Sequence, residues 1–216
     1  MMGLRERKKE QTRRLITETA WRLFTDRGFD HVTVAEVARE AQVALATVFN
    51  YFPTKEDLFY SRLEAFETRL LEAVSAREAG EPVLVAFRRH LLETDGLLAR
   101  ADAGDPDALE QLRTVNRMIA TSPALLARER QTIARYADSL AELLAAETGA
   151  PADDVSAHVA ANALLGVHRT LIDYTRRRML SDEQPARLAA DVRRVGEQGF
   201  ALLERGLGDY AAKPRP

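Results

Sequence analysis

The four histidines of this 216-residue chain are the side chains best suited to metal binding or proton transfer. His158 and His168 would share a helix ten residues apart, which is about 15 Å along the axis and too far for one metal ion. His90 and Glu93 could supply two ligands at i and i+3, but a third is not evident. The sequence has no cysteine and none of the common nucleotide, hydrolase or zinc-protease motifs. We therefore predict no enzymatic activity, no metal and no cofactor.

Basic side chains are concentrated at the start of the chain. Residues 1–14 contain six basic and two acidic side chains, although the formal net charge of the whole chain is −2. Such a run can lie along DNA phosphates or enter the minor groove, or it can be a solvated N-terminal arm. No apolar segment follows it, and no later run approaches 18 uncharged apolar residues. This pattern predicts a cytoplasmic protein without a membrane span.

The elements that must position any functional residue are helices, because the apolar residues recur with helical period and no stretch alternates like a strand. The first helix should end at Gly28, where a glycine tolerates the left-handed backbone. Thr33 and Glu36 form a capping box that opens a short second helix. After a tight turn, a short third helix carries Val48 and Phe52 inward and stops before a Pro-Thr break at residues 53–54.

Beyond that break, Thr54 and Asp57 cap a long fourth helix. Proline and glycine breakers then mark further helices, at Pro82, Asp105-Pro106, Ser122-Pro123, Gly149, Pro151 and Pro185. About nine helices are predicted in an all-α fold. We expect a helix-turn-helix domain at 1–53, a helical domain at 54–210 for effector binding and dimerisation, and a frayed tail at 211–216.

Two short helices joined by a tight turn are typical of a helix-turn-helix, whose second helix enters the major groove of DNA. The run TVAEVAREAQVALATVFNYFPTKEDL at 33–58 resembles the signature of the TetR/AcrR family of transcriptional regulators. Three positions depart from that signature. Gln42 replaces a glycine, so either its backbone is left-handed or bridging or the turn is slightly different. Ala44 replaces a capping serine, and Phe49 replaces a tyrosine that carries a hydroxyl.

The resemblance implies a role for each residue of the motif. Positions matching Thr33, Thr47, Tyr51 and Lys55 hold the DNA backbone in the family. Positions matching Leu45, Ala46 and Asn50 face base edges, where Asn can pair with adenine and small apolar groups can touch a thymine methyl. Phe49 belongs to the same DNA-binding helix. Each residue also has a local explanation, since Thr33 is a cap and Lys55 suits a helix start.

In the family, the last two long helices of two chains form a four-helix interface, and this resemblance favours a homodimer over ordinary packing within one chain. The small and apolar residues predicted at that interface are Val159, Ala163, Val167, Val192, Val195, Gly199 and Phe200. The preceding helices would enclose an effector pocket. Its predicted lining is Phe66, Phe87, His90, Leu91, Leu112, Asn116, Met118, Ile119, Tyr136 and Asn162.

The sequence thus predicts a DNA-binding transcriptional regulator, a repressor that a small, largely apolar effector releases from its operator. Its expected partners are double-stranded operator DNA, a second copy of itself and that effector. A helical protein-interaction module with a vestigial helix-turn-helix is the main alternative. An all-helical enzyme with an unrecognised site is the second, and band shifts on the DNA around its own gene would separate these readings.

Overall fold

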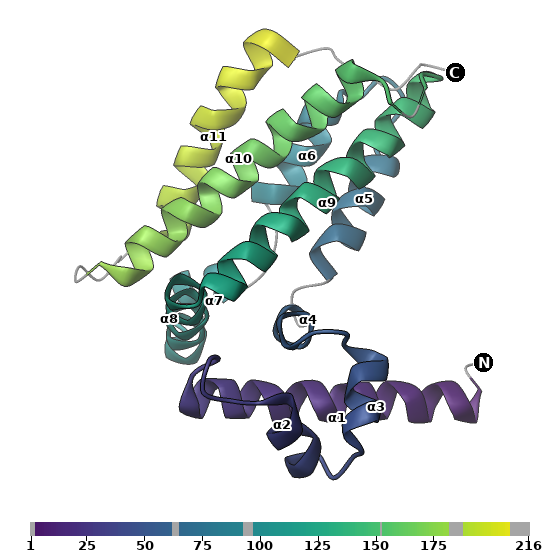
Figure 1. Ribbon diagram of the computed structural model, residues 1–216. Helices are drawn as coiled ribbons and strands as arrows, with labels where there is room; N and C mark the ends of the chain where they lie inside the picture. The colour runs from purple at the N-terminus through teal and green to yellow at the C-terminus, as the bar shows by residue number, and fades with distance from the viewer. Residues whose placement is uncertain (1–2, 62–64, 93–96, 152, 182–187, 208–216) are drawn as a thin grey trace. The chain divides into compact units, whose positions relative to one another are not determined.

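The structure, a computed structural model, describes residues 3–61, 65–92, 97–151, 153–181 and 188–207 (Figure 1). All regular structure in these ranges is helical, as predicted. The helices are α1 (Leu4–Arg27), α2 (Val34–Glu40), α3 (Leu45–Tyr51), α4 (Lys55–Tyr60), α5 (Ala65–Ser75), α6 (Val83–Leu92), α7 (Leu97–Asp102), α8 (Pro106–Thr121), α9 (Pro123–Thr148), α10 (Val155–Leu180) and α11 (Leu188–Leu207). These eleven segments exceed the nine expected. Residues 62–64, which follow α4, and residues 93–96, which follow α6, lie outside the described residues.

The chain divides into two compact units. The first comprises Met1–Ala65 and Thr121–Arg128, and the second comprises Phe66–Ala120 and Glu129–Pro216. Helix α9 therefore contributes its first turns to the first unit and the rest of its length to the second. Within the described ranges, no helix is both long and apolar enough to cross a membrane. The predicted tail at 211–216 and Pro185 lie outside the described residues.

The first unit is built on the apolar face of α1, which packs against α2 and α4. Ile16, Ala20 and Phe24 on that face are almost completely buried. The Phe24 and Phe29 rings lie 5.1 Å apart, and Phe29 and Phe59 lie 5.6 Å apart in an edge-to-face contact. Tilted and edge-to-face aromatic pairs add to the stabilisation from buried area. This aromatic cluster fixes the end of α1 against α4.

The start of α2 has the predicted capping geometry. The Glu36 amide donates to the Thr33 hydroxyl (3.2 Å), and the Thr33 amide donates to the Glu36 carboxylate (2.8 Å). That backbone bond, with further hydrogen bonds from Arg27 and Thr33, lowers the pKa of Glu36 to about 2. The capping box satisfies two amides at the start of the helix, so α2 begins at a defined residue.

The turn between α2 and α3 contains a strained residue, as the sequence predicts. Gln42 has a φ of 54°, the only positive value among described residues other than glycine. The Val43 amide donates back to the carbonyl of Ala38 (2.9 Å), which closes the turn. Ala44 begins α3 without a side-chain cap. The left-handed conformation disfavours a β-carbon, so Gln42 stores strain at the entry to α3.

The first turns of α9 are tied to the first unit by three polar contacts. The Ser122 hydroxyl donates to Asp30 (2.9 Å), and the Tyr60 hydroxyl donates to the carbonyl of Leu125 (3.0 Å). Arg128 forms an ion pair with Asp57. These contacts join residues more than 60 positions apart in the chain, and nothing in the local sequence pattern predicts them.

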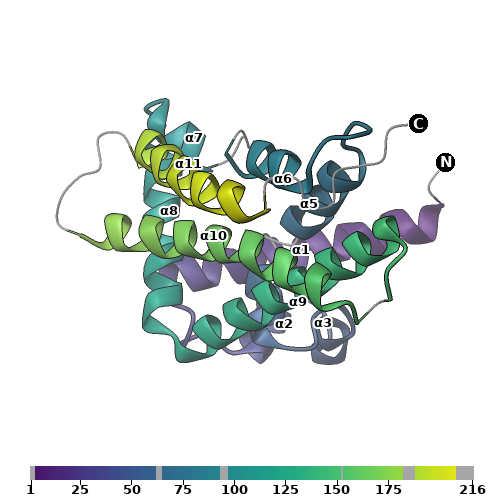
Figure 2. The same cartoon turned by 90° about the horizontal axis from the view of Figure 1, so that it is seen from above.

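The second unit is held by close helix packing, with α11 against α6, α7 and α10. Figures 1 and 2 show α10 and α11 running side by side. A β-carbon at Gly196 would lie 2.5 Å from Leu92 Cδ2, and one at Gly199 would lie 3.2 Å from Val167 Cγ1. These glycines therefore allow close approach within one chain. Two ion pairs with largely buried arginines, Arg77–Glu147 and Arg176–Glu129, also stabilise this unit.

We expect Gln42→Gly to raise the free energy of unfolding by about 0.5–1 kcal/mol, because glycine removes the left-handed strain but gains entropy in the unfolded chain. Urea unfolding of the full chain measures this difference. Gln42→Ala is the matched control and should show no gain, because it keeps the β-carbon. A glycine variant no more stable than the alanine variant would contradict the assignment of strain.

Candidate nucleic-acid interface

Helix α3 presents one face to solvent and anchors the other. Val48 is completely buried and Phe52, just after the helix, is 2% exposed. The predicted base-facing residues Leu45, Ala46 and Asn50 are all exposed. Phe49 is also exposed, at 45%. An exposed face that carries large apolar groups and an amide suits contact with base edges and thymine methyls.

The hydroxyls predicted to meet phosphates lie in different surroundings. Thr47 and Tyr51 are half-buried on α3 and make no side-chain hydrogen bond among the described residues. The Thr33 hydroxyl, by contrast, donates to the Glu36 carboxylate at 2.9 Å while it accepts from the Glu36 amide. Its proton is therefore already used within α2, whereas Thr47 and Tyr51 can donate outward.

Lys55 has an internal role that sequence reasoning did not identify. Its ammonium donates to the carbonyls of Phe29 (2.9 Å) and Val32 (3.0 Å). It also lies 4.1 Å from the centre of the Phe29 ring. The ammonium satisfies carbonyls in the loop between α1 and α2, so only one of its three N–H groups remains for a phosphate. A contact between Lys55 and a DNA phosphate remains a prediction, in addition to this structural role.

The basic run is not a separate arm, because residues from Leu4 onward form the first turns of α1. This corrects the arm interpretation for these residues. Glu6, Lys9, Glu10 and Arg13 of α1 line a hollow of about 500 Å³ together with Asn50 and Tyr51. We call it the α1–α3 hollow. Within it, the Arg13 guanidinium carbon lies 5.7 Å from the centre of the Phe52 ring.

Lys9 and Arg13 thus lie beside the exposed amide and phenol of α3. Sequence reasoning counted them only as part of a basic run. One signal could have found them, since positions 9 and 13 are four residues apart and share a helix face. A helical continuation of α1 through residue 4 would then have placed both beside α3.

The second unit contains an aromatic cluster that includes part of the predicted effector lining. The Phe66 ring lies 5.7 Å from His90 and 5.9 Å from Tyr136, and it stacks on His168 at 4.4 Å. Sequence reasoning missed His168. Its Nδ1 atom is buried and has no hydrogen-bond partner among the described residues. An unsatisfied buried polar atom beside aromatic rings can accept a bond from a bound molecule, or donate one.

The other predicted lining residues do not form one surface. Phe87, Met118 and Ile119 are buried in the protein interior. The Asn116 amide donates to the carbonyl of Leu112 within α8 (2.8 Å). Leu91 is half-buried against the core of the second unit, and Asn162 is exposed on α10. The structure therefore brings only Phe66, His90 and Tyr136 of the predicted set into this aromatic cluster.

The predicted dimer residues differ in how far they are buried within one chain. Phe200 as an interface residue is wrong, because its side chain is completely buried in one chain, 6.1 Å from the Phe87 ring. Val167 and Gly199 pack on each other within that chain. Ala163, Val192 and Val195 are half-buried, and Val159 is exposed. Small residues that allow close helix approach serve packing inside the chain here, which sequence reasoning could not distinguish from packing between chains.

The short α2–turn–α3 unit with its exposed helix face defines a helix-turn-helix DNA-binding regulator. The family model described as "Bacterial regulatory proteins, tetR family" matches residues 16–61. A second model, described as the MftR C-terminal domain, matches residues 82–208, which is more than half of the chain. The chain belongs to the TetR family of transcriptional regulators, a family that is not enzymatic.

The chain is also similar to individual proteins of known sequence or structure. The HTH-type transcriptional regulator TcmR of Streptomyces glaucescens is 29% identical over 152 residues, which are 70% of this chain and 67% of TcmR. The nucleoid occlusion factor SlmA of Haemophilus influenzae is 29% identical over 60% of this chain and 54% of its own length. A transcriptional regulator of Rhodococcus sp. Rha1 has a TM-score of 0.48 at 19% identity, covering 90% of this chain and 96% of that one.

We expect Lys55→Met to lower the free energy of unfolding by about 1–2 kcal/mol, because it leaves the Phe29 and Val32 carbonyls without a charged donor. Thermal unfolding followed by circular dichroism measures the loss. Lys8→Met removes an exposed lysine of α1 and should leave the melting temperature unchanged. Equal melting temperatures for both variants would show that the Lys55 bonds contribute nothing.

We also expect stability to depend on pH through His168. Burial, and then the charge of nearby His90, lower the pKa of His168 from 6.5 to about 4. Between these values the unfolded chain binds more protons than the folded chain, so the stabilisation is complete above pH 6.5 and falls as pH decreases toward 4. His168→Phe keeps the ring and should flatten the loss of stability between pH 6.5 and 4.5 in urea titrations. If the free energy of unfolding of this variant depends on pH as in the unaltered protein, His168 is not the group responsible.

Proposed function

We propose that this chain is a repressor that binds operator DNA as a homodimer and releases it when a small, largely apolar effector binds. The observation that carries DNA recognition is the exposed face of α3 beside the α1–α3 hollow. Asn50 offers an amide for bidentate pairing with adenine, and Thr47 and Tyr51 can donate to phosphates. Lys9 and Arg13 place two cationic groups beside that helix, alternating with Glu6 and Glu10 of the same hollow, and these two groups can contact the DNA backbone.

Two copies of the chain would read two half-sites of a palindromic operator. The outer faces of α10 and α11 support this proposal, because they expose large apolar side chains that packing within the chain leaves uncovered. Val155 is 73% exposed, Val159 is 56% exposed and Leu202 is 63% exposed. Burying these groups against a second copy would remove apolar surface from water. Among the residues predicted at the interface, Val159 is the one that already faces outward.

Effector release is supported by the aromatic cluster of Phe66, His90, Tyr136 and His168 in the second unit. The cluster offers ring faces to an apolar ligand and the buried Nδ1 of His168 to orient it. Helix α9 gives a route for coupling, since Ser122, Leu125 and Arg128 at its start belong to the DNA-binding unit. A ligand that binds better when α9 is displaced would shift the population away from the DNA-binding state. A regulator of this kind would act in the cytoplasm.

Contacts to bases and contacts to phosphates can be distinguished by how the affinity for DNA depends on sequence and on salt concentration. We expect Asn50→Ala to reduce the preference for operator over scrambled DNA by roughly 1–3 kcal/mol, with an unchanged salt slope. Lys9→Ala should weaken both DNAs alike and lower the salt slope by about one for each bound chain, which is about two for the dimer. Lys9 replaces Lys55 in this test because Lys55 also stabilises the fold.

The measurement is a series of binding isotherms on both DNAs across salt concentrations, with the operator first located by band shift in the DNA flanking the gene. Glu110→Ala, on an exposed position of α8, controls for nonspecific effects of substitution. If Asn50→Ala and Lys9→Ala behave identically in both measures, the division into reading and positioning residues is wrong. If no flanking DNA binds with sequence preference, the repressor proposal fails.

The dimer should depend on the outer face of α10. We expect Val159→Glu to give monomers by sedimentation at micromolar concentration, because a buried carboxylate facing its copy is strongly unfavourable. Ala146→Glu adds the same charge at an exposed position of α9 and should remain dimeric. A dimeric Val159→Glu variant, or an unaltered protein that is monomeric, would overturn this interface.

A further inference from the structure

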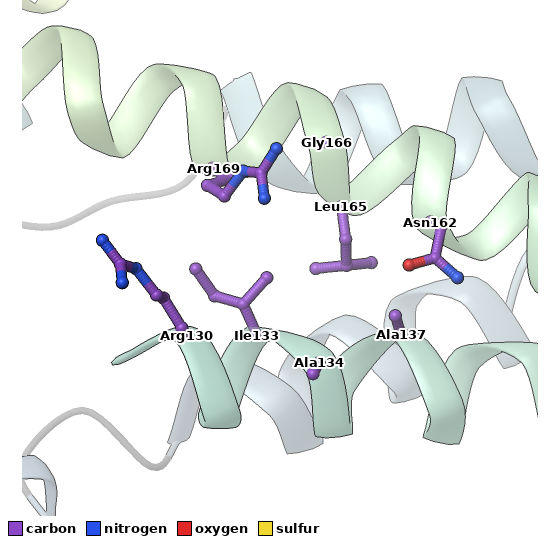
Figure 3. A pocket seen from close by; sticks show the side chains of 8 residues that line it. All are labelled: Arg130, Ile133, Ala134, Ala137, Asn162, Leu165, Gly166 and Arg169. Atoms are coloured by element: carbon purple, nitrogen blue, oxygen red, sulfur yellow. The ribbon is translucent and has the colours of Figure 1, made fainter. Parts of the chain in front are cut away.

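A hollow of about 320 Å³ lies between α9 and α10 in the second unit. Its lining consists of Arg130, Ile133, Ala134, Ala137, Asn162, Leu165, Gly166 and Arg169. Figure 3 shows Arg130 of α9 and Arg169 of α10 toward one end, Asn162 at the other end, and Ile133 and Leu165 between them. We call it the α9–α10 hollow. It has an aliphatic middle and polar ends, and it shares no residue with the aromatic cluster.

Both arginines of the α9–α10 hollow are exposed and have no acidic partner among the described residues. Arg130 and Arg169 form no ion pair among the described residues, and no carboxylate lines the hollow. The neighbouring arginines on the same two helices differ, since Arg128 pairs with Asp57 and Arg176 pairs with Glu129. Two guanidinium groups at one end of an apolar hollow create a positive potential that an anion would relieve.

Asn162 and Gly166 complete the hollow. The Asn162 amide nitrogen donates to the carbonyl of His158 at 2.8 Å, so its oxygen remains available as an acceptor. A β-carbon at Gly166 would have no atom within 4 Å. Packing inside the chain therefore does not require glycine here, in contrast to Gly196 and Gly199. The absence of a side chain at this position keeps the hollow open.

We propose that the α9–α10 hollow binds a small organic carboxylate with an aliphatic body. The guanidinium fork matches the two oxygens of a carboxylate, which makes arginine the preferred partner for this group. The aliphatic side chains of Ile133 and Leu165 bury the body of the ligand. The volume lies at the lower end of the range for small-molecule sites, which favours a short ligand. This site is additional to the effector cluster of the proposed function.

The test titrates the full-length protein with octanoate by calorimetry, and with 1-octanol and acetate as probes that lack either the charge or the apolar body. We expect octanoate to bind more tightly than both. Arg130→Gln and Arg169→Gln should each weaken octanoate binding about tenfold, because each removes a charged hydrogen-bond donor. Arg177→Gln, an exposed arginine of α10 outside the hollow, should leave octanoate affinity unchanged.

A filling variant tests the hollow without removing charge. We expect Gly166→Leu to abolish octanoate binding while the protein stays folded, since leucine is a better helix former than glycine and its β-carbon would meet no atom within 4 Å. Gly206→Leu makes the same exchange on α11, where a β-carbon also meets no atom within 4 Å, and should bind octanoate normally. Circular dichroism verifies the fold of each variant.

Three outcomes would overturn the proposal. One is equal binding of 1-octanol or acetate, and another is full octanoate affinity in Gly166→Leu. The third is dissociation of the dimer by Gly166→Leu while both arginine variants bind octanoate normally, which would make the hollow a subunit interface. Operator affinity is measured separately, so loss of octanoate binding and failure of the repressor proposal remain distinguishable.

Discussion

The orientation of α3 depends on a small amount of buried apolar surface. A helix of seven residues is too short to be stable by itself in water. It also lacks a side-chain cap at Ala44 and enters from the strained Gln42. Burial of Val48 and Phe52 against the rest of the first unit must therefore fix the helix. The exposed side chains of α3 take their direction from those two buried anchors.

The polar contacts of the first unit follow from this constraint. Lys55 uses its ammonium to satisfy the loop between α1 and α2, and Thr33 uses its hydroxyl to begin α2. Both groups hold the frame around α3, which leaves the outward donors to Thr47 and Tyr51. The start of α9 adds Ser122 and Arg128 to the same frame. A position that is predicted to contact DNA can therefore also stabilise the fold of this chain.

In the second unit, the neighbours of each glycine show whether it allows close helix packing or leaves space. Gly196 and Gly199 allow close contacts of α11 within the chain, whereas a β-carbon at Gly166 would meet no atom within 4 Å. The same residue type thus serves two purposes, and only its neighbours distinguish them. The outer faces keep apolar groups such as Val159 and Leu202 exposed, and the hollow between α9 and α10 holds two arginines that have no acidic partner within the described part of the chain. These exposed features carry the proposals for dimerisation and for carboxylate binding.

The sequence alone determined the features that depend on local physics. Helix period, the end of α1 at Gly28 and the Thr33 capping box each depend on residues only a few positions apart, so the pattern predicts them. The positive φ of Gln42 is one of the outcomes that the family resemblance implies. The exposed face of α3 follows from the same period. Some of the interface and pocket assignments were not predictable in this way.

Tertiary structure alone decided which face of a helix meets its own chain and which remains free. An apolar side chain such as Phe200 has the same pattern whether it packs against Phe87 or against a second copy. The bonds of Lys55 to Phe29 and Val32, and the stacking of His168 on Phe66, join positions far apart in the chain. Their partners are set by how the helices cross, and local periodicity carries no information about that crossing.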